Sequence, residues 1–522
     1  MDSLSSKTTI NTLSAELLAD IFLYLHDVIP TWSIKPPIVG QVCQWWRHVT
    51  FLAKELWCTI PIRCDQDGGG RILLAEVYAE RGGDHPLTLL LGYRHNNTVL
   101  PTERVKKLVQ AHAKRVRSLY LWVGPRMYHN FDWLGMSGTG QGEGFQAWSS
   151  LEFCQFRVEW PMDSLSFPIW PNPSYFIPFP SRVSAPNLRK FHAGGGIFPF
   201  NFDLDKNKIR HLVIDFDEAE NAQGYSRANT VAPRIFETFP NLQTFEARLS
   251  PTMSAVRYDS PFSFTLPWSS HQGVGQYTTL RALHLTSGSQ SELEWIPPLP
   301  RLQRLQLGFQ HEKEFSSPSR RATITSLLSF LRRVGGDVEF LSLNIPALSM
   351  GNPEIWHDIL SLTPKVRSLS LSEVREEHNL ERLLNVEETQ PPLVPFLHTL
   401  RWYHDEDAYS HYYTKYGWSI DPLLEMVRSR GWLVDDHQVL SGSKNDKTYL
   451  TSVFVPKPYE ETLVQPGCEA RFEEKRVQLR RWNSELTLEW DEQFYGTYVA
   501  RAWEPIGGAL YQSGRGWARD IE

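Results

Sequence analysis

A hexapeptide that recurs along most of the chain constrains the fold more than any other feature of the sequence. Its form is apolar-x-x-apolar-x-apolar, and alternation of this kind is typical of a strand that buries one face. Self-similarity at intervals of roughly 20 to 50 residues indicates a solenoid. Ten copies begin at Val116, Leu151, Leu188, Ile209, Leu242, Leu280, Leu302, Val338, Val366 and Leu397, and a degenerate eleventh begins at Leu450.

The segments between the copies predict the remainder of each unit. Some copies follow a proline turn, and others follow a helical stretch, such as residues 324–334, 355–362 and 423–429. The units resemble irregular leucine-rich repeats, in which a strand, a turn and a helix or loop lead to the next parallel strand. Intervals between copies run from 21 residues after Leu188 to 38 residues after Leu242. An ordinary α/β domain whose strands share a pattern is the alternative.

Polar residues at the second position of the copies are the predicted substrate-binding set. We expect them to line the concave face of the solenoid, because binding faces of repeat proteins are built from equivalent positions of successive units. The set consists of Arg189, Arg210, Gln243, Arg281, Gln303, Arg367 and His398.

The segment before the repeats has the period of a helix. Five apolar residues recur three and four apart, and a second set follows after Pro30, Pro36 and Pro37, beginning at Ile38. Ser14 is expected to cap the first helix, and Glu16 lies in its first turn, where the helix dipole favours a carboxylate. A bundle this small cannot bury both apolar faces well, so a partner protein is expected. The first set is Leu17, Leu18, Ile21, Phe22 and Leu25.

This segment resembles an F-box, most closely those of the large fungal F-box families. The resemblance is carried by three patterns: Leu13-x-x-Glu16-Leu17-Leu18-x-x-Ile21-Phe22, Val42-Cys43-x-x-Trp46-Arg47 and Leu56-Trp57-x-x-Ile60. It implies docking onto the Skp-type adaptor of an SCF-type cullin-RING ubiquitin ligase, and through the adaptor onto a cullin, while the remaining chain recruits a protein substrate. The implied adaptor-binding residues are Leu13, Ser14, Glu16, Leu17, Leu18, Ile21, Phe22, Val42 and Trp46.

The same segment leaves two points open. Ser14 stands where the family usually has Pro at the first helical position, although a capping Ser also starts a helix. The alternative to an F-box is a helical hairpin that caps a larger domain.

The expected fold class is α/β, with an N-terminal F-box helical bundle and a leucine-rich-repeat-like solenoid containing a parallel sheet. Residues 1–9 are expected to be a flexible tail, 10–64 the F-box, 65–456 the solenoid and 457–522 an aromatic-rich C-terminal cap. The boundary near residue 65 follows from the glycines at 68–70, which are costly to order. Residues 127–144 and 161–180 are expected to be inserted loops, because they are rich in Gly and Pro respectively.

Composition restricts the compartment and the partners. The net charge of −6, with Lys and Arg scattered, gives no reason to expect nucleic acid. No run of 18 apolar residues and no signal peptide are visible, so no membrane is expected. Five cysteines without CxxC spacing fit a reducing compartment. We therefore expect an intracellular protein of the cytoplasm, the nucleus or both.

Catalytic motifs are absent from the sequence, so we expect a non-catalytic subunit without a cofactor or a metal. The glycines of 138–142 lack the following Lys of a phosphate loop, and the His and Asp residues of 404–411 indicate a solvated acidic loop. Cys43 and Cys58 are expected in the bundle core, not as nucleophiles. Two alternatives remain: an F-box scaffold without a ubiquitin ligase role, and a hydrolase or transferase on a solenoid-like α/β fold.

Overall fold

The structure is a computed structural model that describes the repeat strands, their flanking helices and the N-terminal helices. The expected tail 1–9, the two inserted loops, the acidic loop 404–411 and the helix expected at 423–429 lie outside the described residues. The described residues are 10, 13–28, 36–63, 69–92, 102–123, 148–158, 185–194, 204–216, 235–236, 238–249, 279–287, 293, 296–309, 317–345, 353–372, 384, 393–403, 452–456 and 487–491. They belong to two compact units that divide between Ile209 and Arg210.

The first unit begins with a short helical bundle. It contains α1 (Ala15–Val28), α2 (Pro36–Val39), α3 (Gln44–Leu52) and the 3-10 helix η2 (Lys54–Trp57). Ser14 starts α1 as expected, because its Oγ accepts a hydrogen bond from the backbone N–H of Leu17 at 3.3 Å.

The second helix of the bundle differs from the expectation. A continuous helix from Ile38 was predicted, but α2 ends at Val39 and α3 begins at Gln44. Cys43 has an extended backbone and caps α3, its Sγ accepting from the N–H of Trp46 at 3.4 Å. The Nε of Arg47 donates to the carbonyl of Gly40 at 2.9 Å and so closes the turn between the two helices.

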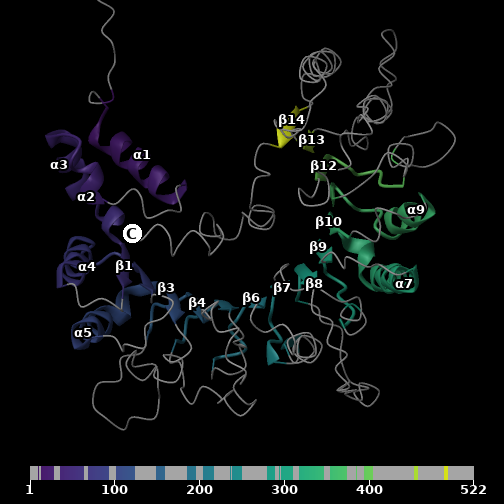
Figure 1. The fold of residues 1–522 in the computed structure, drawn as a ribbon, viewed down its shortest axis with the longest axis horizontal. Coiled ribbons are helices and arrows are strands. Elements are labelled where there is room, and N and C mark those ends of the chain that lie inside the picture. Colours follow the sequence, from purple (N-terminus) through teal and green to yellow (C-terminus); the bar gives the residue numbers. More distant parts are fainter. Residues whose placement is uncertain are drawn as a thin grey trace, which may run out of the picture. The chain divides into compact units, whose positions relative to one another are not determined.

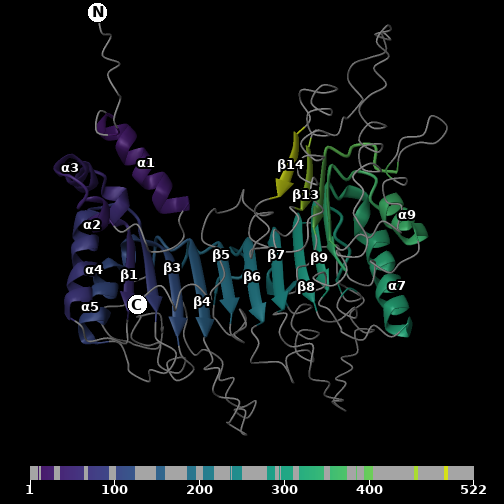
Figure 2. The ribbon, with the colours of Figure 1, turned by 45° about the horizontal axis from the view of Figure 1, so that its top comes forward.

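A parallel ladder of strands completes the first unit. Strand order follows the sequence, and the helices α4 (Gly69–Arg81) and α5 (Glu103–His112) occupy the connections on either side of β2 (Figures 1 and 2). The 3-10 helix η3 (Ala113–Arg115) follows α5 directly. The strands are β1 (Thr59–Arg63), β2 (Leu87–Gly92), β3 (Val116–Val123), β4 (Phe153–Val158) and β5 (Lys190–Gly194).

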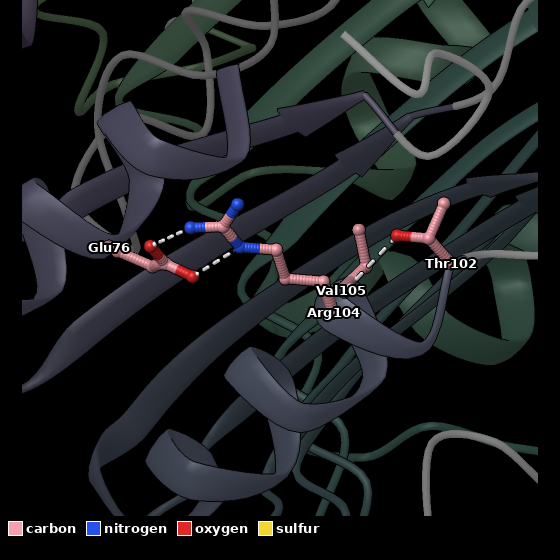
Figure 3. A network of polar contacts seen from close by, with 4 residues as sticks. All are labelled: Glu76, Thr102, Arg104 and Val105. Atoms are coloured by element: carbon pink, nitrogen blue, oxygen red, sulfur yellow. Dashed lines mark hydrogen bonds and ion pairs between the residues drawn. The ribbon is translucent and has the colours of Figure 1, made fainter. Parts of the chain in front are cut away.

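The two helices of this ladder are joined by an ion pair (Figure 3). Arg104 Nη2 and Nε donate to the two carboxylate oxygens of Glu76 at 2.6 and 2.8 Å. Thr102 caps α5 by accepting from the N–H of Val105 at 3.4 Å.

The second unit is a longer parallel ladder, again in sequence order. Helices α7 (Ser317–Val334) and α9 (Pro353–Leu362) lie on the same side of its strands in Figure 1, and η12 (Gly335–Asp337) follows α7. Its strands are β6 (His211–Phe216), β7 (Thr244–Leu249), β8 (Ala282–Ser287), β9 (Arg304–Phe309), β10 (Phe340–Asn344), β11 (Ser368–Ser372), β12 (Thr399–Tyr403), β13 (Ser452–Pro456) and β14 (Thr487–Asp491).

The predicted hexapeptides overlap strands β3 to β13, so the repeat prediction is confirmed. The first and fourth residues of each of the ten full copies are buried in the core, as Leu280 and Leu283 show in one repeat and Leu302 and Leu305 in the next. In register, Leu283 is paired with Leu305, and Leu305 is paired with Leu341. Equivalent leucines therefore stack from strand to strand, which gives a mixed α/β fold with a solenoid-like parallel sheet.

The limits of the ladder differ from the expected domain boundaries. Thr59–Arg63, expected to be part of the F-box, forms the edge strand β1 and is paired with β2 in parallel register. Thr487–Asp491, expected to be part of a C-terminal cap, forms β14 and is paired with β13. Both strands show that the sheet extends beyond the residues in which the hexapeptide is recognisable.

None of the helices in the described part of the chain is both long and apolar enough to cross a membrane.

Candidate functional site

Helix α1 carries two apolar stripes on different faces, one buried and one exposed. Leu18 and Phe22 are fully buried, and the Phe22 ring lies 4.9 Å from the ring of Trp46 on α3. On the other stripe Leu17 is 55% exposed and Ile21 is 36% exposed. The inner stripe therefore holds the bundle together, and the outer stripe is uncovered in this chain.

The outer stripe extends further than the sequence predicted. Tyr24 is 67% exposed and follows Leu17 and Ile21 at the helical spacing i, i+4, i+7. Three aligned apolar side chains on one helix face are the arrangement with which a helix fills a groove of another protein. The spacing itself was the signal that could have identified Tyr24.

A second exposed apolar set lies on α2, on α3 and in the turn between them. Val42 is 62% exposed, as predicted for an adaptor-binding residue, and Ile38 and Trp45 are exposed beside it in sequence. Trp46, predicted as a binding residue, is half buried and packs on Phe22. The sequence did not separate Trp45 from Trp46, since adjacent tryptophans both fit a helix face.

The remaining predicted adaptor-binding residues divide by burial. Ser14 and Glu16 are exposed at the start of α1, and Leu13 is half buried. The pKa of Glu16 is lowered by a hydrogen bond from its own backbone N–H and by one from Ser14, so the carboxylate is favoured. Leu18 and Phe22, which were expected to be shared between the bundle core and the adaptor, are buried in the bundle core.

The predicted substrate-binding residues lie at the amino-terminal ends of the strands, not along the sheet face. Each of the nine full copies after Val116 enters its strand only at the third residue, because its first residue is buried just before the strand begins. The second residue consequently stands just before the strand. This placement holds for Arg189, Arg210, Gln243, Arg281, Gln303, Arg367 and His398.

Backbone hydrogen bonds connect this row in the second unit. The N–H of Arg281 donates to the carbonyl of Gln243, and the N–H of Gln303 donates to the carbonyl of Arg281, both at 2.8 Å. The N–H of His398 donates to Arg367 in the same way at 2.8 Å. The second position thus extends the ladder by one backbone step, which is a structural role independent of the side chain.

Some side chains of the row also hold neighbouring repeats together. Arg210 Nη1 donates to the carbonyl of Asn241 at 3.2 Å, and Arg367 Nε lies 3.9 Å from the carboxylate of Glu339. Arg189, Arg281, Gln303 and Arg367 keep exposed side chains. These contacts do not test whether the side chains bind a substrate. They place the side chains at the edge where the strands begin, and not on the face of the sheet.

Polar residues of the sheet are partly closed to solvent. His284 on β8 lies opposite Glu246 on β7, with Nδ1 at 2.8 Å from the Glu246 carboxylate, and both side chains are buried. Ser370 on β11 is buried as well. A buried acid paired with a histidine satisfies the need of a buried charge for a partner.

Metal-ligating residues and cysteines are the remaining candidates for site chemistry in the described part of the chain. Among them, no three His, Cys, Asp or Glu residues are grouped so as to hold a metal ion. Cys43 and Cys58 are only half buried, which differs from the core positions predicted for them. Burial and the nearby Glu55 raise the pKa of Cys58, although Arg115 opposes them, and burial raises the pKa of Cys154 to about 12.

No protein-family model and no curated protein matches the sequence. Solved structures that are similar to this chain include the crystal structure of the leucine-rich repeat-containing protein LegL7 from Legionella pneumophila. That match has a TM-score of 0.31 and 13% sequence identity, and it covers 71% of this chain and 87% of that chain. The description of this chain as leucine-rich-repeat-like therefore rests on its own strands and their register.

Proposed function

We propose that this protein is the substrate-recruiting subunit of an SCF-type ubiquitin ligase. In this proposal the N-terminal helices bind a Skp-type adaptor, and through it a cullin, while the repeat units hold a protein substrate. The proposal combines the F-box-like residue pattern with a single structural observation, which is the exposed stripe of Leu17, Ile21 and Tyr24 on α1.

The stripe supports a protein partner for a physical reason. Burial of a large apolar side chain stabilises a complex by about 1.5 to 3 kcal/mol, and here three such side chains project from one face of a single helix. Leu18 and Phe22 anchor the buried face of α1, so the stripe needs no rearrangement of the bundle to be presented. A preformed surface of this kind binds without a large loss of conformational entropy.

The proposed mechanism is positioning. A subunit that binds an adaptor at one end and a substrate at the other raises the effective concentration of the substrate near a conjugating enzyme on the same assembly. The exposed side chains Arg189, Arg281, Gln303 and Arg367 are our candidates for the substrate contact. Raised thiol pKa values at Cys58 and Cys154 make these two cysteines poor nucleophiles.

The test is co-purification of the full chain with a Skp-type adaptor. Leu17→Asp and Ile21→Asp should each abolish capture, because an unpaired carboxylate would be buried in the interface. Leu73→Asp is the matched control: Leu73 is exposed on α4, outside the stripe, and its variant should be captured like the wild type. Undiminished capture of the Leu17 and Ile21 variants would contradict the proposal.

Ubiquitin transfer needs a separate measurement. A reconstituted assembly of adaptor, cullin, RING subunit and conjugating enzyme should attach ubiquitin to lysines of this chain. The Leu17→Asp variant should not be modified. Adaptor binding without any transfer would instead favour an interaction scaffold built on the same surface.

A further inference from the structure

Trp57 lies where the N-terminal helices contact helix α4 of the strand ladder. Its side chain is buried, and its Nε1 donates to the carbonyl of Thr50 on α3 at 2.8 Å. Its ring lies 5.1 Å from the ring of Tyr78 on α4, in an edge-to-face arrangement. The 3-10 helix η2 therefore contacts the last turn of α3 on one side and α4 on the other.

Arg81, the last residue of α4, contacts both α3 and η2 through its guanidinium group. The Cζ atom lies 4.2 Å from the ring centre of Phe51 on α3 and 4.4 Å from that of Trp57. Among the described residues, the structure gives Arg81 no carboxylate partner. Its cation is thus shared between two aromatic rings, an arrangement that attracts through the negative ring faces.

The end of α4 that carries Arg81 is itself fixed to the strands. Arg115 donates to the carbonyl of Ala79 and to that of His85, both at 3.2 Å. The N–H of Thr88, on β2, donates to the carbonyl of Cys58 at 2.8 Å. A continuous series of contacts therefore leads from α3 through Arg81 to the edge of the sheet.

We propose that Arg81 is a positioning residue that sets the direction of the adaptor-binding helices relative to strands β1 to β5. This inference rests on the proposed function, and it adds to that function a fixed geometry between the two binding ends. A glycine-rich linker at 65–70 was expected to separate them. The contacts bypass that linker, because α3 reaches the sheet through Trp57 and Arg81.

A spin-label distance measurement tests the geometry without any partner. Ketone-bearing residues at exposed positions 20 on α1 and 107 on α5 allow labelling of the full chain despite its cysteines. The wild type should give one narrow distance distribution, and Arg81→Met should widen it at least twofold. Arg81→Lys keeps the cation and should restore most of the narrow width. Arg117→Met, which breaks the exposed Arg117–Glu152 pair, is the matched control and should change nothing.

Two outcomes would overturn the inference. An equally narrow distribution for Arg81→Met with an unchanged circular dichroism spectrum would show that Arg81 does not set the direction. A broad distribution in the wild type would show that no fixed direction exists, and this result does not depend on whether the variant folds.

A second readout separates positioning from simple stabilisation. In the reconstituted ligase, the wild type should be ubiquitinated on a restricted set of its own lysines, as mapped by mass spectrometry. Arg81→Met should keep adaptor affinity within twofold but spread modification over further lysines, and Arg81→Lys should return the restricted set. An unchanged set in Arg81→Met would contradict the inference. Complete lack of modification in the wild type would instead count against the proposed function, while the distance measurement still decides the role of Arg81.

Discussion

Gly335 occupies a position at which no larger residue fits. A Cβ atom built on it would lie 2.5 Å from the carbonyl oxygen of Leu362 and 3.1 Å from the Thr363 methyl group. The first of these neighbours is backbone, which cannot swing away as a flexible side chain does. The close approach allows the turn η12 after α7 to pack on the end of α9.

We predict that Gly335→Ala destabilises the protein by about 1 to 3 kcal/mol, the usual range for an overpacked core. Gly336→Ala is the matched control, because nothing lies within 4 Å of its added Cβ. In chemical denaturation, Gly335→Ala should have a lower midpoint than the wild type, and Gly336→Ala should not. Equal midpoints would show that the contact with Leu362 relaxes without cost.

Individual residues of the N-terminal bundle show where prediction from sequence ends. The helical period correctly identified α1, and Ser14 was correctly predicted to cap it. Leu17 and Leu18 are adjacent leucines with the same propensity, yet one is exposed and the other is buried. Which face of a helix turns inward depends on the position of its neighbours, here Trp46 on α3, and this position is not encoded in the period.

Pairs of elements are also held by contacts at their surface, as between α4 and α5. The hydrogen bonds from Arg104 lower the pKa of Glu76, so folding favours the charged carboxylate (Figure 3). The stabilisation is present above the unfolded pKa, near its ordinary value of about 4.3. It is lost as the pH falls through the lowered folded pKa.

We predict that Glu76→Gln lowers the denaturation midpoint slightly at pH 7 and leaves it unchanged at a pH below the lowered folded pKa of Glu76, where the wild-type carboxyl is protonated. Both side chains are exposed, so the effect at pH 7 should also shrink with added salt. Denaturation curves at the two pH values check this. If the midpoints of the wild type and Glu76→Gln still differ at the low pH, the difference comes from packing and not from charge.

Within the repeat element, the buried and exposed positions should differ strongly in their effect on stability. Leu305 is fully buried at the fourth position, and Gln303 is exposed at the second. We predict that Leu305→Ala costs about 2 to 5 kcal/mol, because it removes core contacts and leaves a cavity. Gln303→Ala should change stability by at most about 0.5 kcal/mol. Denaturation of both variants measures this, and similar effects would contradict the assigned register.

The elements themselves were largely predictable, because alternating apolar residues mark strands whatever their neighbours. Every predicted hexapeptide from Val116 to Leu450 leads into a strand. The sequence did not show that the strands after β3 begin at the third residue of the hexapeptide, so the proposed substrate-binding set was expected on the face of the sheet and lies just before the strands. Strands β1 and β14 lie where the hexapeptide is absent, so only their pairing with β2 and β13 reveals them.

At the scale of the whole molecule, the sequence predicted a mixed α/β chain with repeated parallel strands, and the structure confirms this. The partner could not follow from the fold, since repeat folds serve many unrelated functions. It depends on surface residues, and the exposed stripe of α1 combined with the F-box-like pattern carries the proposal. Arg281 and Arg367 belong to the proposed substrate-binding set, and the repeat pattern does not specify which protein they would bind.

Photo-crosslinking tests the central claim most directly, because it reports contact and not only affinity. Tyr24 is the most exposed residue of the stripe, and benzoylphenylalanine is close to it in shape. We predict that the full chain carrying this residue at position 24 becomes covalently joined to a Skp-type adaptor on irradiation. The same residue at position 73, on α4, should give no such product. Crosslinking at position 73 but not at position 24, or at neither, would contradict adaptor binding through the exposed stripe.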